Sequence, residues 1–178
     1  MSGSVHPALE APRWAVRFYL RHLPWVLALM AVPATERFLG QLVERTAVTG
    51  VLAEVLTAAA RVLLVVIAVQ LGIRSDSAVG PLSRAVVSQR LDRFFATQWK
   101  PLLLQVLALS VAFLLLNLIP EHLVPALVEV GPMYWAVLLA VKNLTVIPLT
   151  LLWWVGLARH ALTPHKVTKS RARVPDSS

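Results

Sequence analysis

The sequence predicts an all-α integral membrane protein: a bundle of four transmembrane helices with both termini in the cytoplasm. Of its 178 residues, 57% are hydrophobic, and the mean hydropathy is +0.69, well above the usual apolar share of a soluble domain. Long apolar runs indicate the spans, because about twenty residues of helix cross the hydrocarbon core. The distribution of lysine and arginine between the connections then indicates their orientation.

The charge and the absence of cysteine exclude several classes of protein. A net charge of +8 and a pI near 11.1 would suit a nucleic-acid-binding protein. However, the basic residues flank apolar runs instead of covering a soluble face, so we expect no nucleic-acid partner. The chain has no cysteine, which excludes disulfides, thiolate metal sites and a cysteine nucleophile.

The first span is predicted at about residues 18–39. Residues 1–12 are polar and contain proline, and are predicted to be disordered. A basic, aromatic approach segment follows, and the apolar core from 23 to 34 is short unless residues 18–20 also enter the membrane. A cleaved secretory signal is the alternative, but its basic region would be unusually long and Pro33 would lie beside the cut. We therefore expect a retained helix.

The second span is predicted at about residues 51–73, and a helix at about 79–99 precedes the third. This helix is too charged to cross a bilayer and has an aromatic-rich apolar face. Such a helix is predicted to lie flat in the interface, with Phe94 and Trp99 toward acyl chains and Arg90 and Arg93 toward headgroups. The alternative is a helix packed beneath the bundle.

The third span, at about 101–119, has no charge and is predicted to end at Pro120. The fourth, at about 132–158, has aromatic residues near both ends and contains Lys142, Asn143 and Pro148. Proline removes a backbone donor, so the helix should open there and free the carbonyl of Leu144. The basic tail, residues 163–178, is predicted to be disordered.

The positive-inside rule gives the orientation of these spans. Thirteen lysines and arginines fall on one side of the predicted membrane, and two fall on the other. The thirteen are Arg13, Arg17, Arg21, Arg74, Arg84, Arg90, Arg93, Lys100, Arg159, Lys166, Lys169, Arg171 and Arg173, and the two are Arg37 and Arg45. Both termini are therefore expected in the cytoplasm, and the membrane is expected to be a bacterial cytoplasmic (inner) membrane.

The two halves of the chain share a pattern that is typical of a parallel repeat of two hairpins. Residues 17–19 (Arg-Phe-Tyr) precede the first span as 93–95 (Arg-Phe-Phe) precede the third. Each half then carries one basic residue within a span, Arg61 or Lys142. The alternative is that positive-inside bias and aromatic belts produce this likeness without duplication.

The sequence contains no recognisable catalytic or metal-binding constellation. None of the five histidines forms a helical i, i+4 pair, and there is neither a Gly-rich phosphate loop nor a nucleophile elbow. We therefore expect no enzyme activity, no cofactor and no metal. No motif is specific enough to indicate a family.

The charges inside the spans are the candidate site. Charged residues are costly in the membrane and are paired or functional. Arg61, Lys142, Asn143 and Glu54 would form an anion or lipid-headgroup site between the second and fourth spans. The alternative is that Arg61 snorkels to the interface and that Glu54 pairs internally with Arg61 or Lys142, which would only stabilise the packing of the bundle.

Three classes of function are compatible with this sequence. We expect an accessory or scaffolding subunit of an envelope or transport complex, because the chain is small and has little mass outside the membrane. A transporter or lipid-handling permease is the second, and it would be oligomeric because four helices barely enclose a path. A lipid-modifying enzyme is third. The expected partners are the lipid bilayer, anionic headgroups, and a protein partner or a second copy of the chain.

Overall fold

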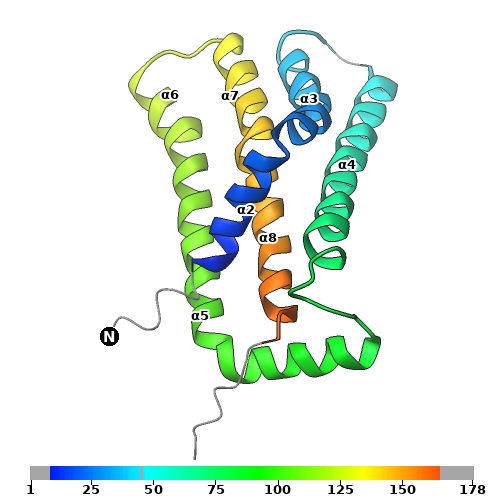
Figure 1. The fold of residues 1–178 in the computed structure, drawn as a ribbon. Helices are drawn as coiled ribbons and strands as arrows, with labels where there is room; N and C mark the ends of the chain where they lie inside the picture. The colour runs from blue at the N-terminus through cyan, green and yellow to red at the C-terminus, as the bar shows by residue number, and fades with distance from the viewer. Residues whose placement is uncertain (1–8, 45, 165–178) are drawn as a thin grey trace, which may run out of the picture.

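All regular elements of the described chain are helical. The computed structural model describes residues 9–44 and 46–164. The helices are α2 (Glu10–Arg21), α3 (Leu23–Leu39), α4 (Ala47–Val69), η1 (Gln70–Arg74), α5 (Arg84–Leu118), η2 (Ile119–Leu123), α6 (Val124–Leu127), α7 (Pro132–Leu144) and α8 (Val146–Leu162). Figure 1 shows the α3–α4 and α6–α7 connections at the upper end of the bundle. The end of α8 and the first part of α5 lie at the lower end.

Three helical segments are long and apolar enough to cross a membrane, or four if one bent pair counts as a span. The three are Ala47–Arg74, Trp99–Leu127 and Pro132–Leu162. The bent pair is α2 with α3. Helices that are long and apolar enough to cross a membrane, as expected from the composition, are therefore present.

The predicted first span is broken near His22, where α2 and α3 meet at 90°. The expectation of one continuous helix over 18–39 is wrong. Pro24 lies at the start of α3, where its ring removes a backbone donor and would clash with the carbonyl of Leu20 in a continuous helix. The expectation of disorder to residue 12 also fails in part, because α2 begins at Glu10; residues 1–8 lie outside the described chain.

The second span is longer than predicted at its start. The side chain of Thr46 accepts a hydrogen bond from the backbone N–H of Thr49 (3.3 Å) and caps α4. A π-helical turn, η1, then carries the helix to Arg74.

The helix predicted at 79–99 begins later and does not end before the third span. Val79 is buried in a connection and Gly80 adopts a positive φ of 68°, so α5 starts only at Arg84, capped by the Ser83 side chain. The helix continues through Pro101. Figure 1 shows its first part crossing the lower end of the bundle before the helix turns upward.

The third span was predicted to end at Pro120, but it continues beyond this residue. The helical path continues through η2 and α6 to Leu127. Pro120 lies in the first turn of η2, where the wider π-helical backbone accommodates its ring. Glu121, expected in a connection, therefore lies on the helix.

The fourth span is divided at Thr145, where α7 ends and α8 begins. Pro148 explains the division, because it cannot donate to the carbonyl of Leu144. That carbonyl instead accepts a hydrogen bond from the Tyr19 hydroxyl (2.8 Å), so α2 satisfies the group that proline frees.

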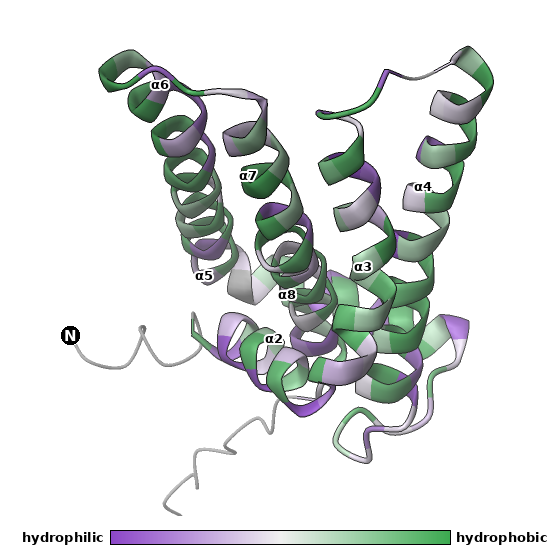
Figure 2. Cartoon of the chain, turned by 90° about the horizontal axis from the view of Figure 1, so that it is seen from above, coloured by the Kyte–Doolittle hydropathy of each residue, from purple (hydrophilic) through white to green (hydrophobic). Residues whose placement is uncertain are grey.

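The apolar core lies where α2, α3, α4 and α8 meet. Its fully buried members include Met30, Leu64 and Leu152. The indole of Trp14 lies between two glycines: a Cβ atom on Gly72 would lie 2.3 Å from its Cζ2 atom, and one on Gly156 would lie 3.0 Å from its Cε3 atom. Figure 2 shows α4, and the part of α5 that leads into α6, as mainly hydrophobic.

Candidate functional site

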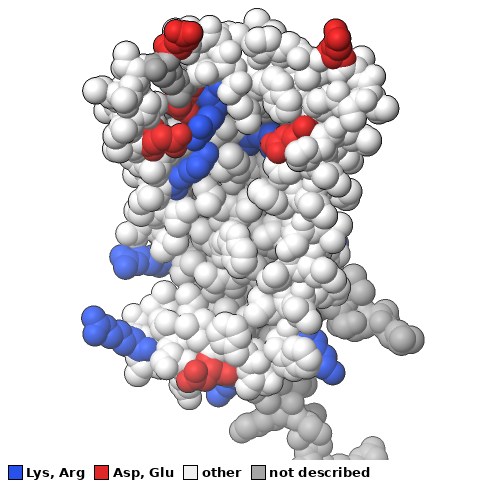
Figure 3. Space-filling view, turned by 180° about the vertical axis from the view of Figure 1, so that it is seen from behind, with Lys and Arg blue, Asp and Glu red and all other residues white. Residues whose placement is uncertain are grey.

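The cations of the predicted site lie on α4 and α7, which both reach the upper end of the bundle in Figure 1. Figure 3 shows acidic and basic side chains together near this end, an uncharged band across the middle, and mainly basic side chains at the lower end. Lys142 and Asn143, adjacent on α7, are both buried, at 8% and 3% exposed. They bring α7 into contact with helices on two sides.

Lys142 is held by the third span. Its ammonium donates to the carboxylate of Glu121 on η2 and to the side-chain oxygen of Asn117 on α5. The hydroxyl of Tyr134, on α7, donates to the carbonyl of Pro120 (2.6 Å), one residue from Glu121. These bonds fasten the upper end of the third span, as Figure 1 shows it, to α7.

Arg61 is held by Asn143. Its Nη2 atom donates to the side-chain oxygen of Asn143 (2.9 Å), whose amide donates to the carbonyl of Leu139 (2.8 Å). The Nε atom of Arg61 is buried and makes no hydrogen bond, and no described carboxylate lies within 4 Å of this guanidinium. Arg61 is therefore bound by a neutral partner.

Glu54 lies apart from both cations of the predicted site. Both of its carboxylate oxygens accept from Nη2 of Arg37, at 2.7 and 2.9 Å. Arg37 also contacts Glu36 (Nε to Oε2, 3.1 Å). The predicted pair of Glu54 with Arg61 or Lys142 does not form in the described chain, because Arg37 at the end of α3 binds this carboxylate. The structure brings together Arg61, Asn143 and Lys142 and leaves Glu54, with its side chain 59% exposed, on the α3–α4 side.

The two predicted cations thus use separate partners on opposite sides of α7. The amide of Asn117 gave no sequence signal beyond its polarity, and Glu121 was hidden by the expectation that Pro120 ends its helix. Chemically, the arrangement joins helices by charge-assisted hydrogen bonds. Among the described residues, no group of three His, Asp or Glu side chains could hold a metal ion.

Two of the predicted interfacial residues, Phe94 and Arg90, contact the rest of the bundle, and the other two are exposed. Phe94 is 6% exposed and meets the ring of His160 edge-on, at 5.8 Å between centroids. Arg90 donates from Nη1 to the carbonyls of Val79 and Leu162, both at 2.6 Å, and so binds the C-terminal end of α8. Both residues were predicted to face lipid, and neither does. Arg93 and Trp99 are exposed. The contacts of Phe94 and Arg90 favour the alternative, a helix packed beneath the bundle.

An ion pair that sequence reasoning did not indicate joins the loop after η1 to the end of α8. Asp76 accepts from Arg159 Nε (2.7 Å) and Nη2 (2.6 Å) and from the backbone N–H of Ala78 (2.8 Å). Burial acts to raise the pKa of the Asp76 carboxyl, but the Ala78 N–H and the Arg159 guanidinium together outweigh it, and the pKa lies below its usual value.

Comparison with known proteins gives no relative from which a function could be transferred. No protein-family model matches the chain, and neither a curated protein nor a solved structure matches it.

Proposed function

We propose that this chain is a small multi-pass membrane protein that acts as an accessory or scaffolding subunit of an envelope or transport complex, without catalysis of its own. It spans a bacterial cytoplasmic membrane four times, with both termini in the cytoplasm. In this proposal, α3 is the first span, and α2 lies against the inner half of the bundle.

The observation that carries the proposal is that the cations in the upper half of the bundle are bound by the chain itself. Arg37 joins α3 to α4 through Glu54, Arg61 joins α4 to α7 through Asn143, and Lys142 joins α7 to η2 through Glu121. Charges used in this way fix the helices relative to one another. A rigid bundle suits a scaffold better than a protein that must open a path.

The distribution of charge supports the orientation. The lower end in Figure 3 is mainly basic, and most of the acidic side chains in this view lie near the upper end, together with basic ones. This agrees with a cytoplasmic lower end. The two halves are also similar in build: a helix with a buried phenylalanine, Phe18 or Phe94, precedes a span in each, which supports the parallel repeat.

The third span offers a surface for a partner. In its most apolar stretch of 18 residues, only 11% is buried, compared with 22% and 28% in the corresponding stretches of the other two long segments. Leu107 and Leu114 are exposed on one face of it, seven residues apart. In a complex, this face would pack against a helix of another subunit.

The test is photo-crosslinking in native membranes. A photoreactive amino acid at Leu107 or at Leu114 should crosslink to the same partner protein. The same amino acid at Leu64, which is 1% exposed, is the control and should give no such adduct. The complex should persist at a fixed ratio in native nanodiscs. A chain that isolates alone, with lipid adducts only, would contradict the proposal.

A second candidate, an oligomeric permease for an anion or a lipid headgroup, is favoured by one observation. Arg61 is a half-buried cation whose described partner is neutral and whose Nε atom makes no hydrogen bond. For a permease, Arg61→Gln should keep the thermal stability and abolish flux of an anionic lipid or inorganic anion in proteoliposomes. Loss of stability without any flux from the unchanged protein would favour the scaffold.

A further inference from the structure

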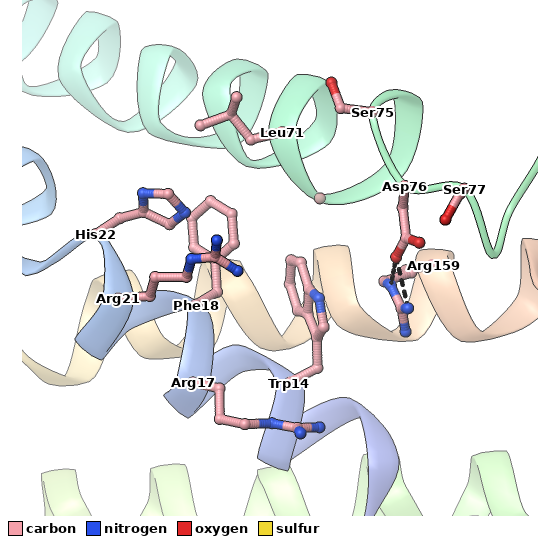
Figure 4. Close-up of a pocket in the computed structure, with 11 residues that line it drawn as sticks. Trp14, Arg17, Phe18, Arg21, His22, Leu71, Ser75, Asp76, Ser77 and Arg159 are labelled. Atoms are coloured by element: carbon pink, nitrogen blue, oxygen red, sulfur yellow. Dashed lines mark hydrogen bonds and ion pairs between the residues drawn. The ribbon is translucent and has the colours of Figure 1, made fainter.

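A cavity of about 610 Å³ lies at the lower part of the bundle, away from the polar residues of the spans. It is bounded by α2, by η1 and the loop that follows, and by the end of α8. Figure 4 shows Trp14, Phe18 and Arg21 projecting from α2 toward η1, with the Asp76–Arg159 pair at one side. The proposed function does not use this cavity.

The lining carries more positive charge than the chain itself neutralises. Arg17, Arg21 and Arg159 line the cavity, together with one carboxylate, that of Asp76. Arg159 binds Asp76, so this pair is internally neutral. Two guanidinium groups therefore remain without a carboxylate within 4 Å in the described chain.

The donors of these two arginines are largely free. Arg17 uses only Nε, which donates to the carbonyl of Arg13 (3.3 Å) on its own helix. Arg21 makes no hydrogen bond to any described residue. A guanidinium presents its donors in a fixed planar fork that matches the oxygens of a phosphate. His22 and the Ser77 hydroxyl add further donors to the lining.

Apolar side chains line the cavity beside the arginines. Trp14, Phe18 and Leu71 line the same cavity. Trp14 and Phe18 lie with their ring centroids 5.1 Å apart, and the absence of side chains at Gly72 and Gly156 lets the Trp14 indole lie close to both helices. A ligand that fits both parts has a phosphate at one end and carbon groups at the other.

We propose that this cavity binds a phosphate-bearing anion, with Arg21 as its donor and Arg17, which Figure 4 shows on the side of α2 turned away from η1, as a second cation at its edge. An anionic phospholipid headgroup and free phosphate share this chemistry. The apolar wall fits the glycerol part of a lipid, and a position at the basic end of the bundle places the cavity beside the headgroups of the inner leaflet if the proposed orientation holds.

The experiment uses the full chain purified in detergent and native mass spectrometry. The ligands are phosphatidylglycerol, phosphatidylcholine and inorganic phosphate, at constant ionic strength. We expect saturable one-to-one binding of phosphatidylglycerol that weakens at least tenfold in Arg17→Gln/Arg21→Gln. In Arg13→Gln, which removes an exposed arginine of the same helix outside the cavity lining, binding should stay within twofold.

The ligands separate the two sources of the phosphate group. Binding of phosphatidylglycerol without inorganic phosphate assigns the cavity to a lipid headgroup, and binding of both assigns it to the phosphate group alone. Equal loss in Arg13→Gln and in the double variant would indicate general surface charge and overturn the proposal, as would the absence of one-to-one binding. If the double variant does not fold, Arg21→Gln against Arg13→Gln makes the same comparison.

Discussion

Lys142 and Asn143 are neighbours on α7, yet their side chains bind helices on different sides of it. Successive residues of an α-helix point about 100° apart. Lys142 therefore reaches Glu121 and Asn117 on the third span, while Asn143 reaches Arg61 on the second. Two adjacent polar residues thus fix the position of α7 between two other spans.

The ion pair of Lys142 with Glu121 should show strong coupling in a double-mutant cycle. Lys142→Met or Glu121→Gln alone leaves one buried polar group without its partner. Each should destabilise the protein by about 2–3 kcal/mol. This is less than the loss of about 3–5 kcal/mol on breaking a fully buried ion pair, because the Glu121 side chain is 32% exposed. The double variant should recover part of the loss in thermal unfolding followed by tryptophan fluorescence.

Glu54→Gln is the matched control for this cycle, because Glu54 binds Arg37. Its effect should add to that of Lys142→Met. Coupling of Lys142 with Glu54 instead of Glu121 would contradict the arrangement of these helices.

The glycines around Trp14 should not tolerate alanine. In Gly156→Ala the new methyl group would lie 2.9 Å from the carbonyl oxygen of Ala11, so α2 must move away from α8. Overpacking of this kind costs about 1–3 kcal/mol. In Gly72→Ala the methyl group meets the indole, so adding Trp14→Ala should restore part of the loss.

Gly50→Ala is the control for these variants, because no atom lies within 4 Å of the position of its Cβ. Alanine there should stabilise α4 by about 0.5–1 kcal/mol through helix propensity. If Gly50→Ala and Gly156→Ala shift the unfolding temperature alike, the close contact of α2 with α8 is not present.

The Asp76–Arg159 pair should make stability depend on acid pH. The pKa of Asp76 is lower in the folded chain, so its contribution is complete above the ordinary aspartate value of about 3.9 and is lost as pH falls through the folded value. Asp76→Asn should lower stability at pH 7 by about 1–2 kcal/mol, because both side chains are about a quarter exposed.

The difference between Asp76→Asn and the unchanged protein should shrink toward pH 3 in thermal unfolding. Asp92→Asn, which alters an exposed aspartate on α5, should give no comparable difference at either pH. A loss in Asp76→Asn that is equally large at pH 7 and pH 3 would mean that the ion pair contributes nothing.

Single cysteines should establish the orientation, since the chain has none of its own. Placed at Thr46 and Glu129, they should react with an impermeant maleimide from outside; placed at Ser75 and Ser170, they should not. Labelling of residue 170 from outside would mean an odd number of spans and would revive the cleaved-signal interpretation.

The helical class and the long apolar segments were predictable because both follow from local composition. The positions at which these segments break were less predictable. Pro148 interrupts its span as proline should, whereas Pro120 does not end its helix, because a π-helical turn accommodates it. The sequence shows where each proline lies. Whether the backbone can adjust to that proline depends on the packing of neighbouring helices, which the sequence does not show.

The partners within the candidate site were not predictable. Spacing along one helix suggested Glu54 for Arg61, but the guanidinium that binds Glu54 comes from the end of α3. The amphipathic pattern of α5 likewise indicated an apolar face without showing whether lipid or α8 would cover it. Such choices depend on distances between segments that are far apart in sequence.

The close fit of α2 against α8 also constrains how the chain matures during synthesis. The segment that carries Trp14 leaves the ribosome well before the segment that carries Gly156. At ordinary elongation rates the two are separated by about 10–30 s. Until then the Trp14 indole lacks its contact with Gly156, and the carbonyl of Leu144 lacks the hydrogen bond from the Tyr19 hydroxyl. The helix α2 is therefore made early but reaches its final packing late, and chains that stall before α8 would expose this basic amphipathic helix to quality control.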